Sequence, residues 1–217
     1  MRMARTTAWA LAAAALVAAG PALAQTAVGV RVFGGYDTYA MGDAEDIRHA
    51  LFIPSSEYST PRDGYSMGVG AELAWRQSLS LTFSYERLTP GRMSEVNGQK
   101  MQLPCNALLL EAEYRRRLRP RFMIGAGLGG GYYQLGEEIE SPGTDRDLEG
   151  SAFGGQAFAI GEWEMTPVAT LGLDIGYRAA KVGVDHVNRE PPFTDVEVDY
   201  SGLITRLVLR YMPRRTR

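Results

Sequence analysis

The sequence predicts an all-β protein, an eight-stranded antiparallel up-and-down transmembrane β-barrel. Three observations predict this fold. Apolar residues alternate with small or polar residues in eight segments, short turns and long polar links alternate between these segments, and aromatic residues stand at the ends of the apolar stripes. Period-two alternation is typical of strands, and a barrel with turns at one end and loops at the other is typical of strands that cross a membrane.

The N-terminus predicts secretion. Arg2 and Arg5 precede an apolar run over residues 8–19, and Ala22-Leu23-Ala24 follows it. A basic start, an apolar middle and a small-x-small end are typical of a signal peptide. We therefore expect residues 1–24 to be a signal peptide and residues 25–217 to form the barrel domain. The mature part contains no apolar run of about 18 residues, which a transmembrane helix would need.

The eight predicted strands are read from the alternation alone. In residues 78–86, Leu79, Leu81, Phe83 and Tyr85 fall on one face and serine, threonine and glutamate residues on the other, a pattern that does not fit a helix. The sixth segment has the thinnest apolar face. In order, the predicted strands are residues 28–37, 67–75, 78–86, 108–115, 122–132, 153–164, 169–178 and 203–211.

The links between these strands alternate in length. Tight turns are predicted near Gln77, Arg119-Pro120 and Thr166-Pro167, whereas the other links are long and polar, over residues 42–62, 90–103, 137–150 and 183–198. In an outer-membrane barrel the short turns are periplasmic and the long loops are extracellular. Within the first long loop, Asp43 is placed to cap a helical turn.

The binary pattern also fits a soluble barrel such as a lipocalin, which has its apolar face inside. Two further features favour a membrane barrel. The first is the set of aromatic residues at the strand ends, because aromatic residues form girdles at both interfaces of such barrels. The predicted interfacial aromatics are Tyr36, Trp75, Tyr85, Tyr114, Tyr132, Trp163, Tyr177 and Tyr211. The other face carries acids and arginines with almost no lysine, which indicates an internal charge network: Arg31, Glu72, Glu86, Glu111, Glu113, Arg115, Glu162, Asp174, Arg178, Arg206 and Arg210.

With these stripes, the mature chain resembles the small eight-stranded outer-membrane barrels related to the OmpA transmembrane domain and OmpX. The resemblance implies a location in the bacterial outer membrane and a lumen filled by side chains rather than an open channel. Residues 203–211 resemble the C-terminal strand of such proteins, but Met212-Pro213 and a basic tail follow the terminal aromatic Tyr211. No peptidoglycan-binding domain follows the barrel, so that activity is not implied.

Motifs for catalysis or cofactor binding are weak. Gly125, Gly127 and Gly130 match a dinucleotide-binding pattern, but they lie inside a predicted strand with no helix after them. His49 and His186 lie in predicted loops, and neither belongs to the His-x-Ser motif of outer-membrane lipid A deacylases. The sequence therefore predicts no enzyme activity, no cofactor and no metal site. Cys105 is the only cysteine, which excludes an internal disulfide.

Charge separates the two ends of the predicted barrel. The long loops and their flanks hold seventeen acidic and six basic residues, whereas arginines gather at the turn end and in the tail. Loss of the signal peptide changes the net charge from −2 to −4, which argues against nucleic acid as a partner. The expected partners are outer-membrane lipids, with divalent cations or surface partners at the loops, and the sequence defines no oligomeric state.

We therefore expect a non-enzymatic barrel that contributes to envelope structure or to surface interaction. The alternative is a narrow pore or small-solute carrier, and a lipid-modifying enzyme stands third.

Overall fold

The computed structural model describes residues 26–41, 62–75, 78–91, 100–135, 138–140, 148–187 and 197–213. The expected signal peptide and the helical turn expected after Asp43 lie outside these residues. Within the described ranges, no helix is long and apolar enough to span a membrane.

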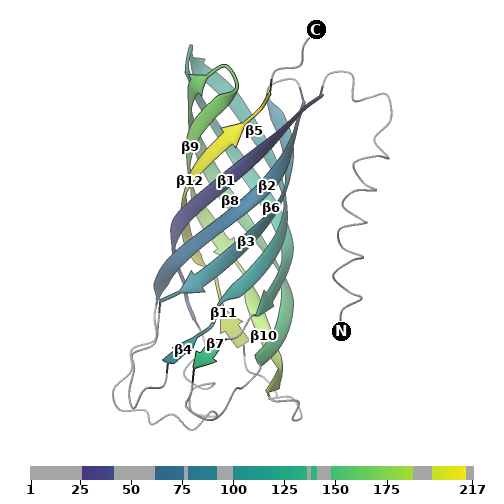
Figure 1. Cartoon of the computed structure of the whole chain (residues 1–217), viewed down its shortest axis with the longest axis vertical. Helices are drawn as coiled ribbons and strands as arrows, with labels where there is room; N and C mark the ends of the chain where they lie inside the picture. Colours follow the sequence, from purple (N-terminus) through teal and green to yellow (C-terminus); the bar gives the residue numbers. More distant parts are fainter. Residues whose placement is uncertain are drawn as a thin grey trace.

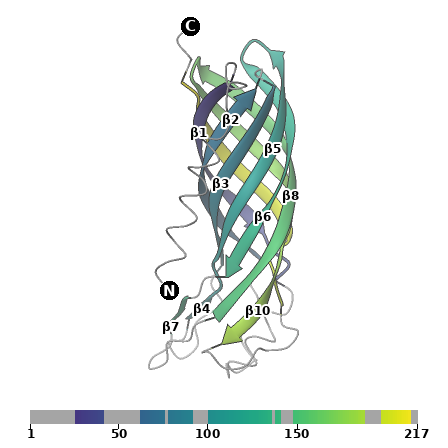
Figure 2. The ribbon, with the colours of Figure 1, turned by 90° about the vertical axis from the view of Figure 1, so that its right-hand side faces the viewer.

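Eight antiparallel strands close into a barrel, so the predicted fold is confirmed (Figure 1). The sheet closes because β12 pairs with both β9 and β1. Figure 2, turned by 90°, shows the strands tilted around the barrel axis, as closure requires. The barrel strands are β1 (Thr26–Thr38), β2 (Asp63–Trp75), β3 (Leu79–Pro90), β5 (Cys105–Arg119), β6 (Phe122–Leu135), β8 (Leu148–Thr166), β9 (Ala169–Ala179) and β12 (Gly202–Tyr211).

Four shorter strands extend the barrel at its loop end, at the bottom of Figure 1. β10 (Lys181–Val187) continues from β9 and pairs with both β8 and β11 (Glu197–Asp199). β4 (Lys100–Gln102) and β7 (Glu138–Glu140) form a separate two-stranded sheet. The wall of the barrel therefore continues beyond the eight predicted segments at this end.

The opposite end carries the tight turns. β8 passes into β9 through a turn in which the Thr166 hydroxyl accepts hydrogen bonds from the amides of Val168, at 3.3 Å, and Ala169, at 3.0 Å. β5 and β6 are separated by two residues, Pro120 and Arg121. These turns fall where the sequence predicts them. The three-residue gap between β2 and β3 agrees with the turn predicted near Gln77.

The alternation determines which side chains enter the lumen. The thin sixth segment is a strand, β8, and it is the longest, with 19 residues. Its Phe158 and Ile160 point inward and are buried. Gly127 on β6 is paired with Phe158, and a Cβ at Gly127 would overlap the phenylalanine ring. A Cβ at Gly129 would lie 2.6 Å from Cγ of Glu111. The glycines of β6 thus leave room for large side chains from both neighbouring strands.

Candidate functional site in the barrel lumen

The eleven residues predicted to form a luminal charge network all lie inside the barrel. Each has an exposed fraction of 7% or less. Seven of the eight barrel strands contribute a member, and the exception is the glycine-rich β6. The members are Arg31, Glu72, Glu86, Glu111, Glu113, Arg115, Glu162, Asp174, Arg178, Arg206 and Arg210.

Nearest the turn end, two arginines share three carboxylates. Arg210 lies 3.0 Å from Glu162, 3.0 Å from Glu113 and 3.2 Å from Glu72, measured between nitrogen and oxygen. Arg115 also pairs with Glu72 and lies 3.4 Å from Glu162. Glu113 also lies 3.9 Å from Arg115, so each carboxylate bridges the two guanidinium groups and neither arginine depends on one partner.

In the middle of the lumen, Arg31 donates to Glu113 at 2.6 Å and pairs with Glu111. This arginine and Arg206 both lie over the ring of Phe33, with their guanidinium carbons 5.2 and 5.0 Å from its centroid. Cation–π attraction favours such an arrangement, and more strongly where water is excluded. Phe33 thus offers one aromatic ring to two positive charges.

Towards the loop end, Arg206 donates to Glu86 at 2.8 Å and to the amide oxygen of Gln156 at 2.8 Å. Gln156 in turn donates to Glu111 at 2.5 Å. Arg178 donates to the other oxygen of Glu86, at 2.9 Å. The hydrogen bonds therefore join strands that lie on opposite sides of the barrel.

Two further members of the network were absent from the sequence prediction. Asp37 is fully buried and accepts from Arg178 at 3.1 Å, and Gln156 is 5% exposed. Both lie at inward-facing positions of their strands, because Asp37 is an even number of positions from Arg31 on β1 and Gln156 an even number from Phe158 on β8. The alternation therefore contained the signal for both residues.

With Asp37 included, the described lumen buries seven carboxyl groups and five guanidinium groups. Asp174 has the weakest pairing, because its nearest arginine nitrogen, on Arg210, is 3.9 Å away and its Oδ1 has no hydrogen-bond partner. A buried carboxylate without a close partner is costly.

The loop-end part of the lumen is apolar, which the sequence analysis did not predict. The inward positions of β5 change from Glu113 and Glu111 to Leu109, Ala107 and Cys105 along the strand. The same change occurs on β3, β9 and β10. We call this group the apolar cap: Tyr39, Met41, Leu88, Leu103, Cys105, Ala107, Leu109, Tyr133, Leu135, Ala180, Val182, Val184, Val198 and Tyr200.

The apolar cap contains few polar atoms, and only some of them have a hydrogen-bond partner. The Tyr200 hydroxyl donates to the carbonyl of Leu103 at 2.9 Å, and the rings of Tyr39 and Tyr200 pack edge to face at 6.1 Å. Cys105 is fully buried here, where a free thiol behaves as a small apolar residue. The cap therefore fills the lumen beyond the charge network.

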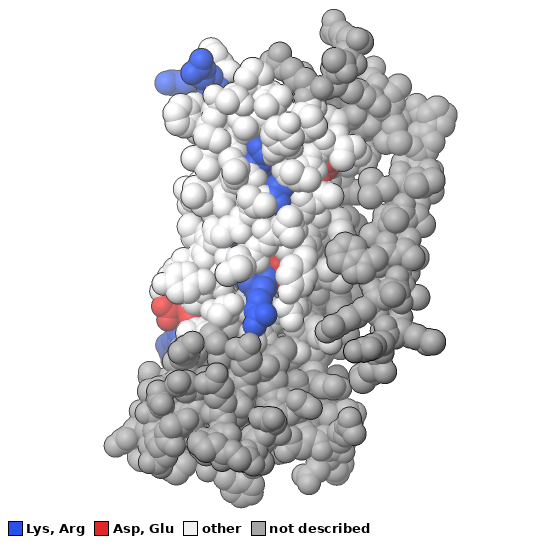
Figure 3. Space-filling view, viewed as in Figure 1, with Lys and Arg blue, Asp and Glu red and all other residues white. Residues whose placement is uncertain are grey.

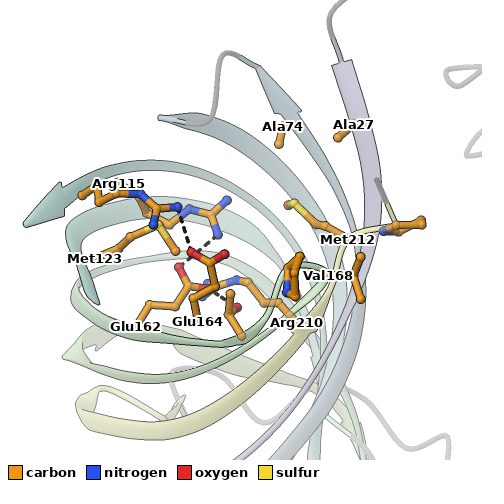
Figure 4. Close-up of a pocket in the computed structure, with 13 residues that line it drawn as sticks. Ala27, Ala74, Arg115, Met123, Glu162, Glu164, Val168, Arg210 and Met212 are labelled. Carbon is orange, nitrogen blue, oxygen red and sulfur yellow. Dashed lines mark hydrogen bonds and ion pairs between the residues drawn. The ribbon is translucent and has the colours of Figure 1, made fainter. Parts of the chain in front are cut away.

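At the turn end, the lumen opens into a cavity of about 290 Å³ (Figure 4). Arg115, Glu162 and Arg210 form its charged inner wall and point toward one another, while Val168 and Met212 line another side. Arg117 and Glu164 pair at 2.8 Å and also line the cavity. The charge network therefore forms the inner end of this cavity, and the arginines there already bind carboxylates.

The outer wall is apolar and bounded by aromatic residues. Figure 3 shows mostly uncharged side chains along the described wall. All eight predicted interfacial aromatics point outward, with exposed fractions of 38–54%. Strand register separates them into two groups. Trp75, Tyr114, Trp163 and Tyr211 lie toward the turn end, and Tyr36, Tyr85, Tyr132 and Tyr177 toward the loop end.

The outward residues agree with a lipid environment, because a lipid-facing band flanked by aromatic girdles is a feature of outer-membrane barrels. Tyr85 also donates to the amide oxygen of Asn106 at 2.6 Å, near the loop-end girdle. An aromatic ring with a polar tip suits the interface, where one end is apolar and the other is hydrated.

Residues considered for catalysis are not assembled into a site in the described part of the protein. His49 lies outside it, and the side chains of Asp185 and His186 are not described. Near the loop end, the hydroxyl of Ser201 accepts a hydrogen bond from the Ala180 amide at 3.0 Å. Among the described residues, no group of three or more His, Cys, Asp or Glu side chains could hold a metal ion.

Comparisons with known proteins agree with this fold. No protein-family model matches the sequence, and no curated protein matches it. The structure is similar to that of outer membrane protein OprG from Pseudomonas aeruginosa, with a TM-score of 0.57 and 12% identity over 88% of this chain and 98% of that one. A major outer membrane protein from Thermus thermophilus gives a TM-score of 0.50 and 10% identity, over 86% and 99% of the two chains.

The outer membrane protease OmpT from Escherichia coli also matches, with a TM-score of 0.41 and 9% identity, over 87% and 95% of the two chains. At such identities the likenesses to OprG and to the Thermus thermophilus protein show the fold alone, and the activity is argued from this chain. The fold and the apolar wall define an eight-stranded β-barrel protein of the bacterial outer membrane.

Proposed function

We propose that the protein is a non-enzymatic outer-membrane barrel with a closed lumen, which contributes to envelope structure or to surface interaction through its acidic extracellular loops. The filling of the lumen carries this proposal. Arg31, Arg178, Arg206 and Arg210 are at most 1% exposed, so within the described part of the barrel their side chains are packed and do not line an open channel. The interior of an eight-stranded barrel is narrow enough for side chains to fill it.

Opening the lumen would also be costly. A path for solutes past Arg206 must separate it from Glu86 or Gln156, which lie 2.8 Å away. Breaking a buried ion pair leaves an uncompensated charge and typically costs about 3–5 kcal/mol. Beyond the network, the same path must cross the apolar cap. These two barriers in series favour the closed state.

Conductance in planar lipid bilayers tests the closed lumen. We expect no steady conductance from the unmodified protein. The variant Tyr133→Ala/Arg206→Ala removes one large side chain from each barrier and should show a small leak, which establishes that the assay detects an opened barrel. Lys181→Ala, on the exposed loop end, is the control and should remain closed. Stable ion-selective channels from the unmodified protein would instead support the pore alternative.

The non-enzymatic part of the proposal rests on how the polar side chains are used. Luminal Ser80 and Ser84 accept hydrogen bonds from Arg115 and Arg31, so each of these hydroxyls is engaged by an arginine of the charge network. Mass spectrometry of lipopolysaccharide and phospholipids incubated with the protein tests this point. Unchanged lipids support the proposal, whereas deacylation or acyl transfer contradicts it.

The proposed loop interactions rest on charge. At the loop end, Lys181 lies 4.0 Å from Glu197 and 3.9 Å from Asp199, so one cation already attracts two acids there. Calcium binding, measured by equilibrium dialysis, should fall when Glu197 and the acids of residues 137–150 are replaced by their amides. Unchanged binding in that variant, or no binding by the parent, would remove divalent cations as partners.

A further inference from the structure

The turn between β5 and β6 carries arginines that the luminal network does not use. Arg116, Arg119 and Arg121, which we call the rim arginines, are exposed. No acidic side chain among the described residues pairs with any of them. Their neighbour Arg117 differs, because it binds Glu164 at 2.8 Å and donates to the carbonyl of Pro120. The only described acid beside this turn is therefore already occupied.

A β-bulge sets the rim arginines beside the lipid-facing wall. The register of β5 and β6 shifts between Arg117 and Arg119, and such a bulge redirects the side chains around it. Leu118, the extra residue, is 59% exposed. Leu118 and Arg119 consequently line one hollow together, although they are consecutive residues.

This hollow combines positive charge with an apolar floor. It has a volume of about 670 Å³ and is lined by Leu118, Arg119, Pro120, Arg121, Phe122 and Trp163. Arg119 is paired with Phe122, which is paired with Trp163 on β8. Trp163 belongs to the turn-end girdle, so the hollow lies at the depth where lipid headgroups meet acyl chains.

Arginines are concentrated at this turn, whereas the turn between β2 and β3 contains Arg76 alone. The turn between β8 and β9, at Thr166, Pro167 and Val168, contains no charged residue. Figure 3 shows one group of blue side chains at the turn end and others lower on the wall. A general requirement for charge at the periplasmic end would not concentrate arginines at one turn and leave another uncharged.

We propose that this hollow is a binding site for an anionic phospholipid of the inner leaflet. Arg119 and Arg121 bind the headgroup phosphate, and one acyl chain lies along Leu118, Phe122 and Trp163. Guanidinium groups match phosphate oxygens in geometry and charge, and basic clusters beside a membrane attract anionic lipids. A zwitterionic lipid offers the same chains but no net negative charge, so the site discriminates by headgroup.

Trp163 itself reports occupancy, because brominated acyl chains quench tryptophan fluorescence on contact. The mature protein, isolated from outer membranes with Trp75→Phe, is reconstituted into bilayers containing brominated phosphatidylglycerol or brominated phosphatidylethanolamine. We expect stronger quenching by phosphatidylglycerol at equal mole fraction. The preference should fall roughly fivefold for each arginine removed in Arg119→Gln and Arg121→Gln. Added salt should also weaken it, because the arginines are exposed.

The control variant is Lys181→Gln, which removes one positive charge at the opposite end of the barrel and should leave the preference unchanged. Both arginines are exposed, so the variants should fold. On gels, each variant should show the same change in mobility on heating as the parent protein, which verifies that it is folded. Equal quenching by the two lipids in the parent protein would overturn the proposal. A preference that persists in Arg119→Gln/Arg121→Gln would overturn it as well, since the attraction would then lie elsewhere.

Discussion

Removal of Arg178 tests most directly whether the luminal charges hold the barrel together. Arg178 is the arginine that binds Asp37, at 3.1 Å, and it also binds Glu86, at 2.9 Å. Glu86 keeps Arg206 at 2.8 Å when Arg178 is lost, but Asp37 is left without a cation. We expect Arg178→Met to lower the free energy of unfolding by about 3–5 kcal/mol, the range for breaking a buried pair.

The double variant Arg178→Met/Asp37→Leu removes both charges and should recover most of that loss, because apolar replacement of a whole buried pair is often neutral. Lys181→Met is the control for an exposed ion pair and should lower the free energy of unfolding by at most about 1 kcal/mol. Urea titration in detergent micelles, followed by tryptophan emission and by band shift on gels, measures all three. If Arg178→Met costs no more than Lys181→Met, or if the double variant loses the sum of its single changes, the reasoning fails.

Three other variants test the wall, the packing and the cap by the same titration. Leu207→Arg, in the middle of β12 and 57% exposed, should cost about 2–4 kcal/mol, and Tyr211→Arg, at the girdle, about 0–1 kcal/mol; equal costs would contradict the lipid-facing assignment. Gly127→Ala should cost about 1–3 kcal/mol by overpacking against Phe158, and Phe158→Leu in the same chain should restore part of it; no recovery would place the strain elsewhere. Leu109→Ala should cost about 2–5 kcal/mol if the cap is a packed core, whereas a loss below about 1 kcal/mol would indicate a loosely filled loop end.

The missing parts of the sequence prediction have a common cause. Period-two alternation assigned Glu111 and Arg206 to the lumen, but it could not show that Gln156 connects them, since Gln156 comes from a third strand. The apolar cap was missed because Leu109 and Cys105 break the rule that inward positions are polar. That rule applies only within the charged part of the lumen. Beyond it, the inward side chains pack against one another and again favour apolar residues.

The amino-acid sequence by itself determined the class of fold and which side chains of each predicted strand share a face. Every strand from β1 to β12 that forms the barrel could be read from alternation, because a pleated strand sends successive residues to opposite faces. The tertiary structure decided the partners. Arg178 meets Asp37 and Glu86 only because closure of the barrel brings β9, β1 and β3 around one lumen. Strand register also places Trp163 beside Phe122 and the arginines of a distant turn. Such neighbours depend on closure and stagger, which the alternation of a single strand does not encode.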